Sequence, residues 1–160
     1  MKILIYPKHH DPLDQAIAFI THGKGSHAAF LRADGRRIHE AFFPEVRDRL
    51  VLPGDMARAE VYAIEGLSEE QHRRFEALFD ANLHRHIKYS IGDLFRYLLN
   101  RPDRDEHHTF CSRYVMHCCR RVLHPVQMPL VRLPDNDWAS PRDLRISPRL
   151  HLLPDFWRGK

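Results

Sequence analysis

The dipeptide Asp34-Gly35 lies between two strand-like segments, and it limits how this chain can fold more than any other feature. Asp-Gly favours a two-residue hairpin turn, because the residues of that turn take positive φ angles. Such a turn pairs Ala33 with Arg36 across two antiparallel strands. The register of the whole hairpin then follows, one residue at a time, away from the turn.

This register assigns three polar side chains to opposite faces of the sheet. Alternate residues of a strand share a face, so His27 and Glu40 lie together and His39 points to the other side. Glu40 is a diagonal neighbour of His27, within reach of a long side chain. A three-residue loop would reverse the parity, and His39 would then replace Glu40 as the neighbour of His27.

The remaining patterns predict an antiparallel meander followed by a helical half. A single domain over residues 1–160 fits this length. Ser68 to Gln71 matches a capping box at the start of a helix. The elements expected are strands at 2–6, 27–32, 36–43, 45–52 and 59–64, helices at 13–21, 68–86, 91–99 and 109–123, a turn at 53–55, and an extended proline-containing tail after 125.

Charge and hydropathy exclude several kinds of partner. The net charge is only +4, with 25 basic and 21 acidic residues mixed along the chain, which argues against a nucleic-acid binder. No apolar run approaches the roughly 18 residues that a membrane span needs. The apolar segment at 2–6 is too short for a signal peptide. We therefore expect a cytoplasmic protein, with export by a signal-independent route left open.

Cys111 is the candidate nucleophile because it lies where the predicted 109–123 helix begins, with Thr109 as a possible N-cap. The positive end of a helix dipole lowers the pKa of a thiol there, and the thiolate is the nucleophilic form. His27 follows a glycine-containing loop and is the candidate base. Glu40 is the candidate group that orients the His27 ring.

Three segments together resemble the permuted NlpC-type papain-like hydrolases, in which the histidine precedes the cysteine. They read GSHAAF at 25–30, IHEA at 38–41 and FCSRYV at 110–115, and SPRDL at 140–144 resembles the ending of that family. Arg113 is a departure, because the family more often has glutamate there. The resemblance implies an α+β papain-like fold, circularly permuted, with about five antiparallel strands packed against helices and the nucleophile at a helix N-terminus.

The resemblance also implies a function. Cys111 would act as nucleophile, His27 as base and Glu40 as the orienting residue of a cysteine peptidase or amidase that cleaves a small or cell-wall-type peptide through a thioester. Tyr89 would help to bind the substrate oxyanion, and no cofactor would be needed. Glu40→Gln would then cut turnover, and His39→Gln would do little. Substrate identity and oligomeric state stay undetermined.

Three other functions compete with this interpretation. Related permuted enzymes transfer acyl chains on lipids, and a papain-like domain can lose its activity and only bind. A zinc site is the third, because histidines and cysteines cluster between residues 107 and 119. The cysteines there are adjacent or seven residues apart, which does not match the usual ligand spacing of structural zinc.

Overall fold

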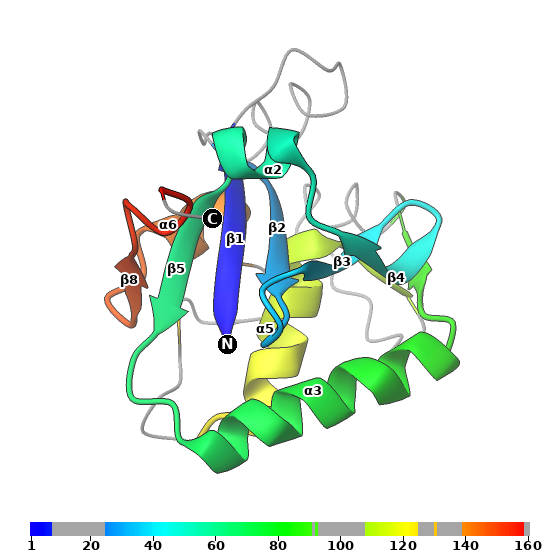
Figure 1. The fold of residues 1–160 in the computed structure, drawn as a ribbon. Coiled ribbons are helices and arrows are strands. Elements are labelled where there is room, and N and C mark those ends of the chain that lie inside the picture. Colours follow the sequence, from blue (N-terminus) through cyan, green and yellow to red (C-terminus); the bar gives the residue numbers. More distant parts are fainter. Residues whose placement is uncertain (8–24, 91, 93–107, 125–129, 131–138, 159–160) are drawn as a thin grey trace.

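The computed structural model describes residues 1–7, 25–90, 92, 108–124, 130 and 139–158. Within these residues, eight strands form one sheet in the order β7-β6-β4-β3-β2-β1-β5-β8 (Figure 1). Neighbouring strands are antiparallel except β6 and β7, which are parallel. The strands are β1 (Lys2–Pro7), β2 (Gly25–Leu31), β3 (Arg37–Phe42), β4 (Glu45–Leu50), β5 (Glu60–Ile64), β6 (Lys88–Tyr89), β7 (His108–Thr109) and β8 (Leu150–Leu152).

Three helices build the larger core on one face of this sheet, namely α3 (Glu69–His84), α5 (Cys111–Val122) and α6 (Pro141–Arg145). The short helix α2 (Pro53–Arg58) lies by the opposite face, where its Asp55 accepts a hydrogen bond from the Tyr6 hydroxyl. Helix α5 lies behind β1 and β2 in Figure 1 and packs against β2 and β3. Phe30 of β2 meets Phe75 and Phe79 of α3 in this core, with ring centroids 5.6 and 4.9 Å apart.

A smaller core lies on the opposite face of the central strands. Leu4, Ala29, Leu31 and Ile38 belong to it, and the C-terminal segment with Trp157 covers part of it. The Trp157 indole N–H donates to the carbonyl of Ala59, the residue before β5, at 3.2 Å. Alternate residues of β1, β2 and β3 therefore serve two different cores, which pins the strand register on both sides.

The hairpin register expected from Asp34-Gly35 is confirmed. Phe30 pairs with His39 and Leu31 with Ile38. The two-residue turn itself is wrong, because residues 33–36 form the turn, closed by the hydrogen bond from the Arg32 N–H to the Arg37 carbonyl at 2.9 Å, and Gly35 but not Asp34 has a positive φ. Gly35 has a φ of 65°, in the region that favours glycine. The three-residue alternative with reversed parity is thereby wrong.

Several other expectations need correction. The sheet has eight strands within the described residues, not about five, because short strands extend both edges of the meander. Residues 53–58 form helix α2 where a turn was expected, and residues 141–145 form α6 where the tail was expected to be extended. Ser140 and Asp143 make a capping box that starts α6. The helices expected at 13–21 and 91–99 lie outside the described residues, the second except for residue 92.

Other boundaries agree closely with the sequence. Helix α3 starts after Ser68, whose side chain accepts from the Gln71 N–H, while the Gln71 side chain accepts from the Ser68 N–H.

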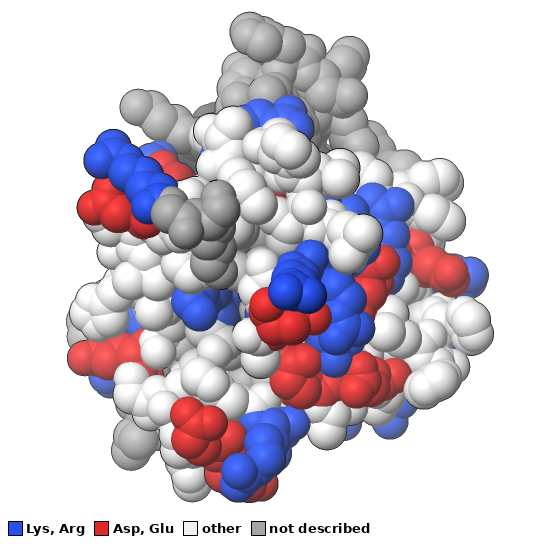
Figure 2. All heavy atoms as spheres, viewed as in Figure 1, with Lys and Arg blue, Asp and Glu red and all other residues white. Residues whose placement is uncertain are grey.

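Basic and acidic side chains lie side by side on the face shown in Figure 2. Among the helices of the described residues, none has the length and apolar character needed to cross a membrane.

Arg32 ties the hairpin to α3 through a buried charge. Its side chain is 4% exposed and donates to Asp48 of β4 at 2.6 Å and to Glu76 and Asp80 of α3, both at 2.7 Å. A buried guanidinium needs such partners, because an unpaired charge inside a protein is strongly destabilising. Three carboxylates on two elements therefore converge on one side chain.

Replacing Arg32 should destabilise the fold. Arg32→Gln leaves three carboxylates facing each other without their shared cation, and we expect a loss of about 2–3 kcal/mol in the free energy of unfolding. Urea denaturation followed by circular dichroism measures it. Arg37→Gln is the matched control, because Arg37 is 46% exposed and should contribute at most about 1 kcal/mol. Equal losses for the two variants would contradict the role given to Arg32.

Candidate functional site

His27 and Glu40 meet on one face of the hairpin, as the register requires. The His27 Nε2 lies 3.0 Å from Glu40 Oε2, and the Glu40 side chain is only 1% exposed. With Nε2 bonded to the carboxylate, Nδ1 is the ring nitrogen left for another partner. The Glu40 carboxylate thus fixes both the orientation of the ring and the position of its protons.

Cys111 is that other partner. It is the first residue of α5, is buried, and lies near enough to the His27 ring for the two groups to shift each other's pKa. The N-cap is Phe110, not Thr109, and it provides no side-chain cap. The imidazole of His27 and the backbone N–H groups of Ala28 and Ser112 all lower the pKa of Cys111, so the surroundings of the sulfur favour its thiolate.

The electrostatics of Cys111 and His27 favour a charged pair. Burial opposes ionisation of Cys111, but the hydrogen bond and positive charge of His27 outweigh it, so the pKa of Cys111 is lowered. Burial also opposes the imidazolium, yet the bonds to Cys111 and Glu40 raise the pKa of His27 to about 10. The thiolate and the imidazolium thus stabilise each other, which is the state a thiol nucleophile requires.

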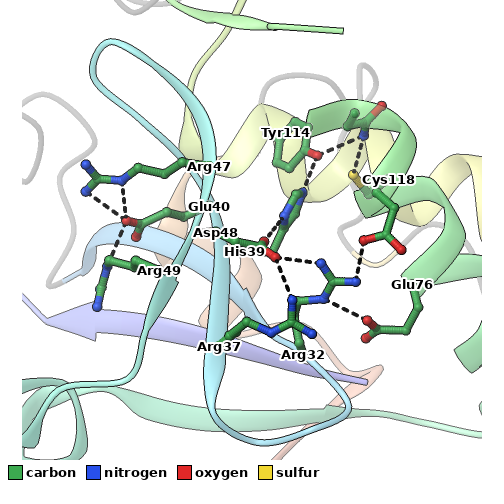
Figure 3. A network of polar contacts seen from close by, with 12 residues as sticks. Arg32, Arg37, His39, Glu40, Arg47, Asp48, Arg49, Glu76, Tyr114 and Cys118 are labelled. Atoms are coloured by element: carbon green, nitrogen blue, oxygen red, sulfur yellow. Dashed lines mark hydrogen bonds and ion pairs between the residues drawn. The ribbon is translucent and has the colours of Figure 1, made fainter. Parts of the chain in front are cut away.

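Two arginines of β4 hold the Glu40 carboxylate (Figure 3). Arg47 donates to Oε1 from Nε at 3.1 Å and from Nη2 at 3.0 Å, and Arg49 donates to the same oxygen at 2.8 Å. Burial raises the pKa of Glu40, but the bond and charge of His27 and the charge of Arg49 lower it to about 2. Glu40 is therefore a carboxylate at any physiological pH.

A second layer supports Arg49. Asp55 of α2 accepts from Arg49 Nη1 at 2.7 Å and from Nη2 at 2.8 Å, and it also accepts from the Tyr6 hydroxyl at 2.9 Å. The Tyr6 ring lies 5.6 Å from the His27 ring, and Phe42 meets His27 edge-on at the same distance. Aromatic rings on both sides thus restrict how the imidazole can tilt.

His39 lies on the other face and takes no part in this group. It is fully buried, with Nδ1 2.6 Å from Asp48 and Nε2 2.7 Å from the Tyr114 hydroxyl (Figure 3). Tyr114 also accepts from the Asn82 amide at 2.8 Å. Since Tyr114 lies one turn after Cys111, this chain of bonds anchors α5 to the sheet near the nucleophile.

The remaining predicted site residue, Tyr89, lies close to Cys111 along the backbone pairing of β6 and β7. It lies half-buried on β6 and pairs with Thr109, two residues before Cys111. Its contribution to substrate binding stays a prediction.

The other two cysteines, Cys118 and Cys119, are fully buried in the core. Burial raises the pKa of Cys118 to about 12 and that of Cys119 well above its ordinary range. Neither is suited to be a nucleophile.

Sequence reasoning missed Arg47 and Arg49. The available signal was their spacing, because residues two apart share a face, and the turn after Phe42 pairs Glu40 with Arg47. Extending the register from the first hairpin to the second would have placed both arginines beside Glu40. The contribution of Asp55 was hidden, because residues 53–55 were expected to be a turn rather than the start of α2.

Comparison with known proteins defines the fold but not the activity. No family model matches the chain, and no curated protein does. Among solved structures it is similar to one described as the crystal structure of metalloprotein yiiX from Escherichia coli O157:H7, DUF1105, with a TM-score of 0.66 and 18% identity over 94% of each chain. At this identity the likeness concerns the fold alone, and it replaces the five-stranded papain-like fold expected from the sequence.

His39→Gln should lower stability rather than leave the protein unaffected. Glutamine cannot bridge Asp48 and Tyr114 at the same time, so one buried group loses its partner, at a cost of about 1–3 kcal/mol. Chemical denaturation measures the loss. The alkylation rate of Cys111 in the folded variant should stay within about twofold of wild type, because His39 lies on the opposite face of β3 from Glu40 and does not contact His27. A stable variant with an unreactive Cys111 would contradict this separation of faces.

Proposed function

We propose that the chain is a cysteine-dependent hydrolase that cleaves an amide bond, in which Cys111 is the nucleophile, His27 the base and Glu40 the orienting group. The observation that supports this most is the His27 ring, which is bonded to the buried Glu40 carboxylate and shares an electrostatic interaction with the buried Cys111 thiol. A structural cysteine does not need an imidazole held by a buried carboxylate. Nucleophile, base and orienting group are the parts that thiol catalysis combines.

The chemistry follows from the charged pair. The Cys111 thiolate attacks the substrate carbonyl carbon, and the His27 imidazolium donates its proton to the leaving amine as the carbon–nitrogen bond breaks. A thioester and a neutral imidazole result. Water then loses a proton to His27 as it attacks the thioester, and the carboxylic acid leaves as the Cys111 sulfur takes back the electron pair. The backbone N–H of Cys111 and the Tyr89 hydroxyl are the candidate donors to the oxyanion.

A small peptide or amide is the substrate class we favour. On the face shown in Figure 2, the basic and acidic side chains of the described residues are mixed and form no extended basic patch of the kind that a lipid surface would attract. Acyl transfer on a lipid would use the same nucleophile and thioester, so the two reactions differ only in donor and acceptor. A domain that binds without catalysis is the third outcome, and the reactivity of Cys111 separates it from both enzymes.

The word metalloprotein in the description of the similar structure raises the question of a metal. Within the described ranges, no group of three or more histidine, cysteine, aspartate or glutamate side chains is arranged to hold an ion. The Glu40 carboxylate is already occupied by His27 and two arginines. The residues described here therefore do not fit a metal centre, and the reaction above uses none. His107 of the alternative zinc cluster lies outside the described residues.

Alkylation of Cys111 tests the charged pair directly. We expect iodoacetamide to label Cys111 at a rate that levels off well below pH 8.5, the ordinary pKa of a cysteine thiol. Peptide-level mass spectrometry assigns the label, and the buried Cys118 and Cys119 serve as internal controls. His27→Ala should move the titration to the ordinary range or above it. An ordinary titration in wild type, indifferent to His27, would overturn the proposed function.

Glu40→Gln separates orientation from nucleophilicity. The amide can still accept from an arginine but loses the charge that stabilises the imidazolium, so we expect the pKa of Cys111 to rise and turnover to fall by orders of magnitude. The first readout is the alkylation titration, and the second is hydrolysis of a fluorogenic amide library. Unchanged titration in a folded Glu40→Gln variant would remove Glu40 from the mechanism. Metal analysis of the same preparations checks that no bound ion accounts for the change.

A further inference from the structure

The Glu40 carboxylate divides its two oxygens between different partners. Oε2 faces His27, whereas Oε1 takes three N–H donors, two from Arg47 and one from Arg49. Three donors on one oxygen hold the carboxylate so that the other oxygen is presented to the imidazole. The arginines thus decide which oxygen His27 meets, and they place positive charge immediately behind it.

The two arginines are not equivalent. Arg49 is matched by Asp55, which takes two of its N–H groups, so its charge is largely offset by a second carboxylate. Within the part of the chain that the structure describes, Glu40 is the carboxylate with which Arg47 pairs. The Arg47 side chain is 40% exposed, and its guanidinium lies 4.5 Å from the ring centroid of Phe42, the residue that meets His27 edge-on.

We propose that Arg47 is a positioning residue whose charge, acting through Glu40, sets the pH at which Cys111 becomes a thiolate. This inference rests on the proposed function, since it concerns the same pair. A positive charge near an ionising group makes loss of a proton easier. Arg47 supplies that charge from the solvent side, where a single substitution can remove it without emptying a core position.

The surroundings of His27 and Cys111 determine the expected sign. Among the residues that the structure describes, and apart from Arg47, the titratable or charged groups near this pair are Glu40 of β3, Tyr6 of β1, Arg49 of β4 and, behind Arg49, Asp55 of α2. When Arg47 is replaced, Glu40 keeps its bond to His27 and its donor from Arg49. In Arg47→Gln the Glu40 carboxylate still keeps His27 protonated, unlike in Glu40→Gln, where the imidazolium is lost. Loss of one positive charge beside that imidazolium then disfavours the thiolate, so we expect the pKa of Cys111 to rise.

The test is the alkylation titration of Cys111 in Arg47→Gln and Arg47→Lys. A rise of about half a pKa unit in Arg47→Gln would slow labelling about threefold on the acidic limb of the curve and leave the plateau rate unchanged. Arg47→Lys keeps the charge and should restore the wild-type limb. The shift should shrink in 1 M salt, because the side chain is partly exposed. Arg73→Gln is the control, since Arg73 is a 73% exposed arginine that pairs with Glu70 on α3.

The outcomes separate the two levels of the proposal. An unshifted acidic limb in Arg47→Gln overturns the role of Arg47, even if wild-type Cys111 has a low pKa that depends on His27. If both Arg47 variants lower the alkylation rate at high pH without shifting the pH dependence, Arg47 has a structural role, and its proposed electrostatic role is overturned. If wild-type Cys111 titrates like an ordinary thiol regardless of His27, the proposed function fails, and an Arg47-dependent shift would still be measurable on that curve.

Discussion

The alternation of strand β3 is the constraint on which the site depends. His39 and Glu40 are adjacent in sequence, yet the pleat sends them to opposite faces and into different networks. Glu40 turns toward His27 and the arginines, and His39 turns toward Asp48 and Tyr114. One strand thereby organises the candidate reactive group on one side and the attachment of α5 on the other.

Charge compensation explains why a carboxylate can lie in such a buried place. Glu40 is almost fully enclosed, and an isolated ionised carboxylate there would be strongly destabilising. The imidazole and two guanidinium groups offset that cost and leave the carboxylate ionised. Asp55 in turn balances Arg49, so that no group of this cluster is left with an unmatched buried charge. The polar cluster is therefore best understood as one electrostatic unit rather than as separate ion pairs.

Much of the site could be predicted from the sequence, because local rules determine it. Asp34-Gly35 fixes the hairpin register, and strand alternation then gives the contact between His27 and Glu40 without tertiary information. The position of Cys111 at a helix start follows from helix periodicity. The short strands β6, β7 and β8 could not be predicted, because each has only two or three residues and forms only where tertiary packing brings it to a sheet edge. The arginine pair required the register of the next hairpin.

The bond between His39 and Tyr114 has a consequence for the position of the thiol. Tyr114 is one turn from Cys111 on α5, so sliding of α5 along the sheet would break this buried bond. The bond therefore opposes displacement of the helix that carries the sulfur. At the end of β3, by contrast, Phe42 and Phe43 are 41% and 58% exposed, so the surface beside the His27 ring is apolar and less enclosed.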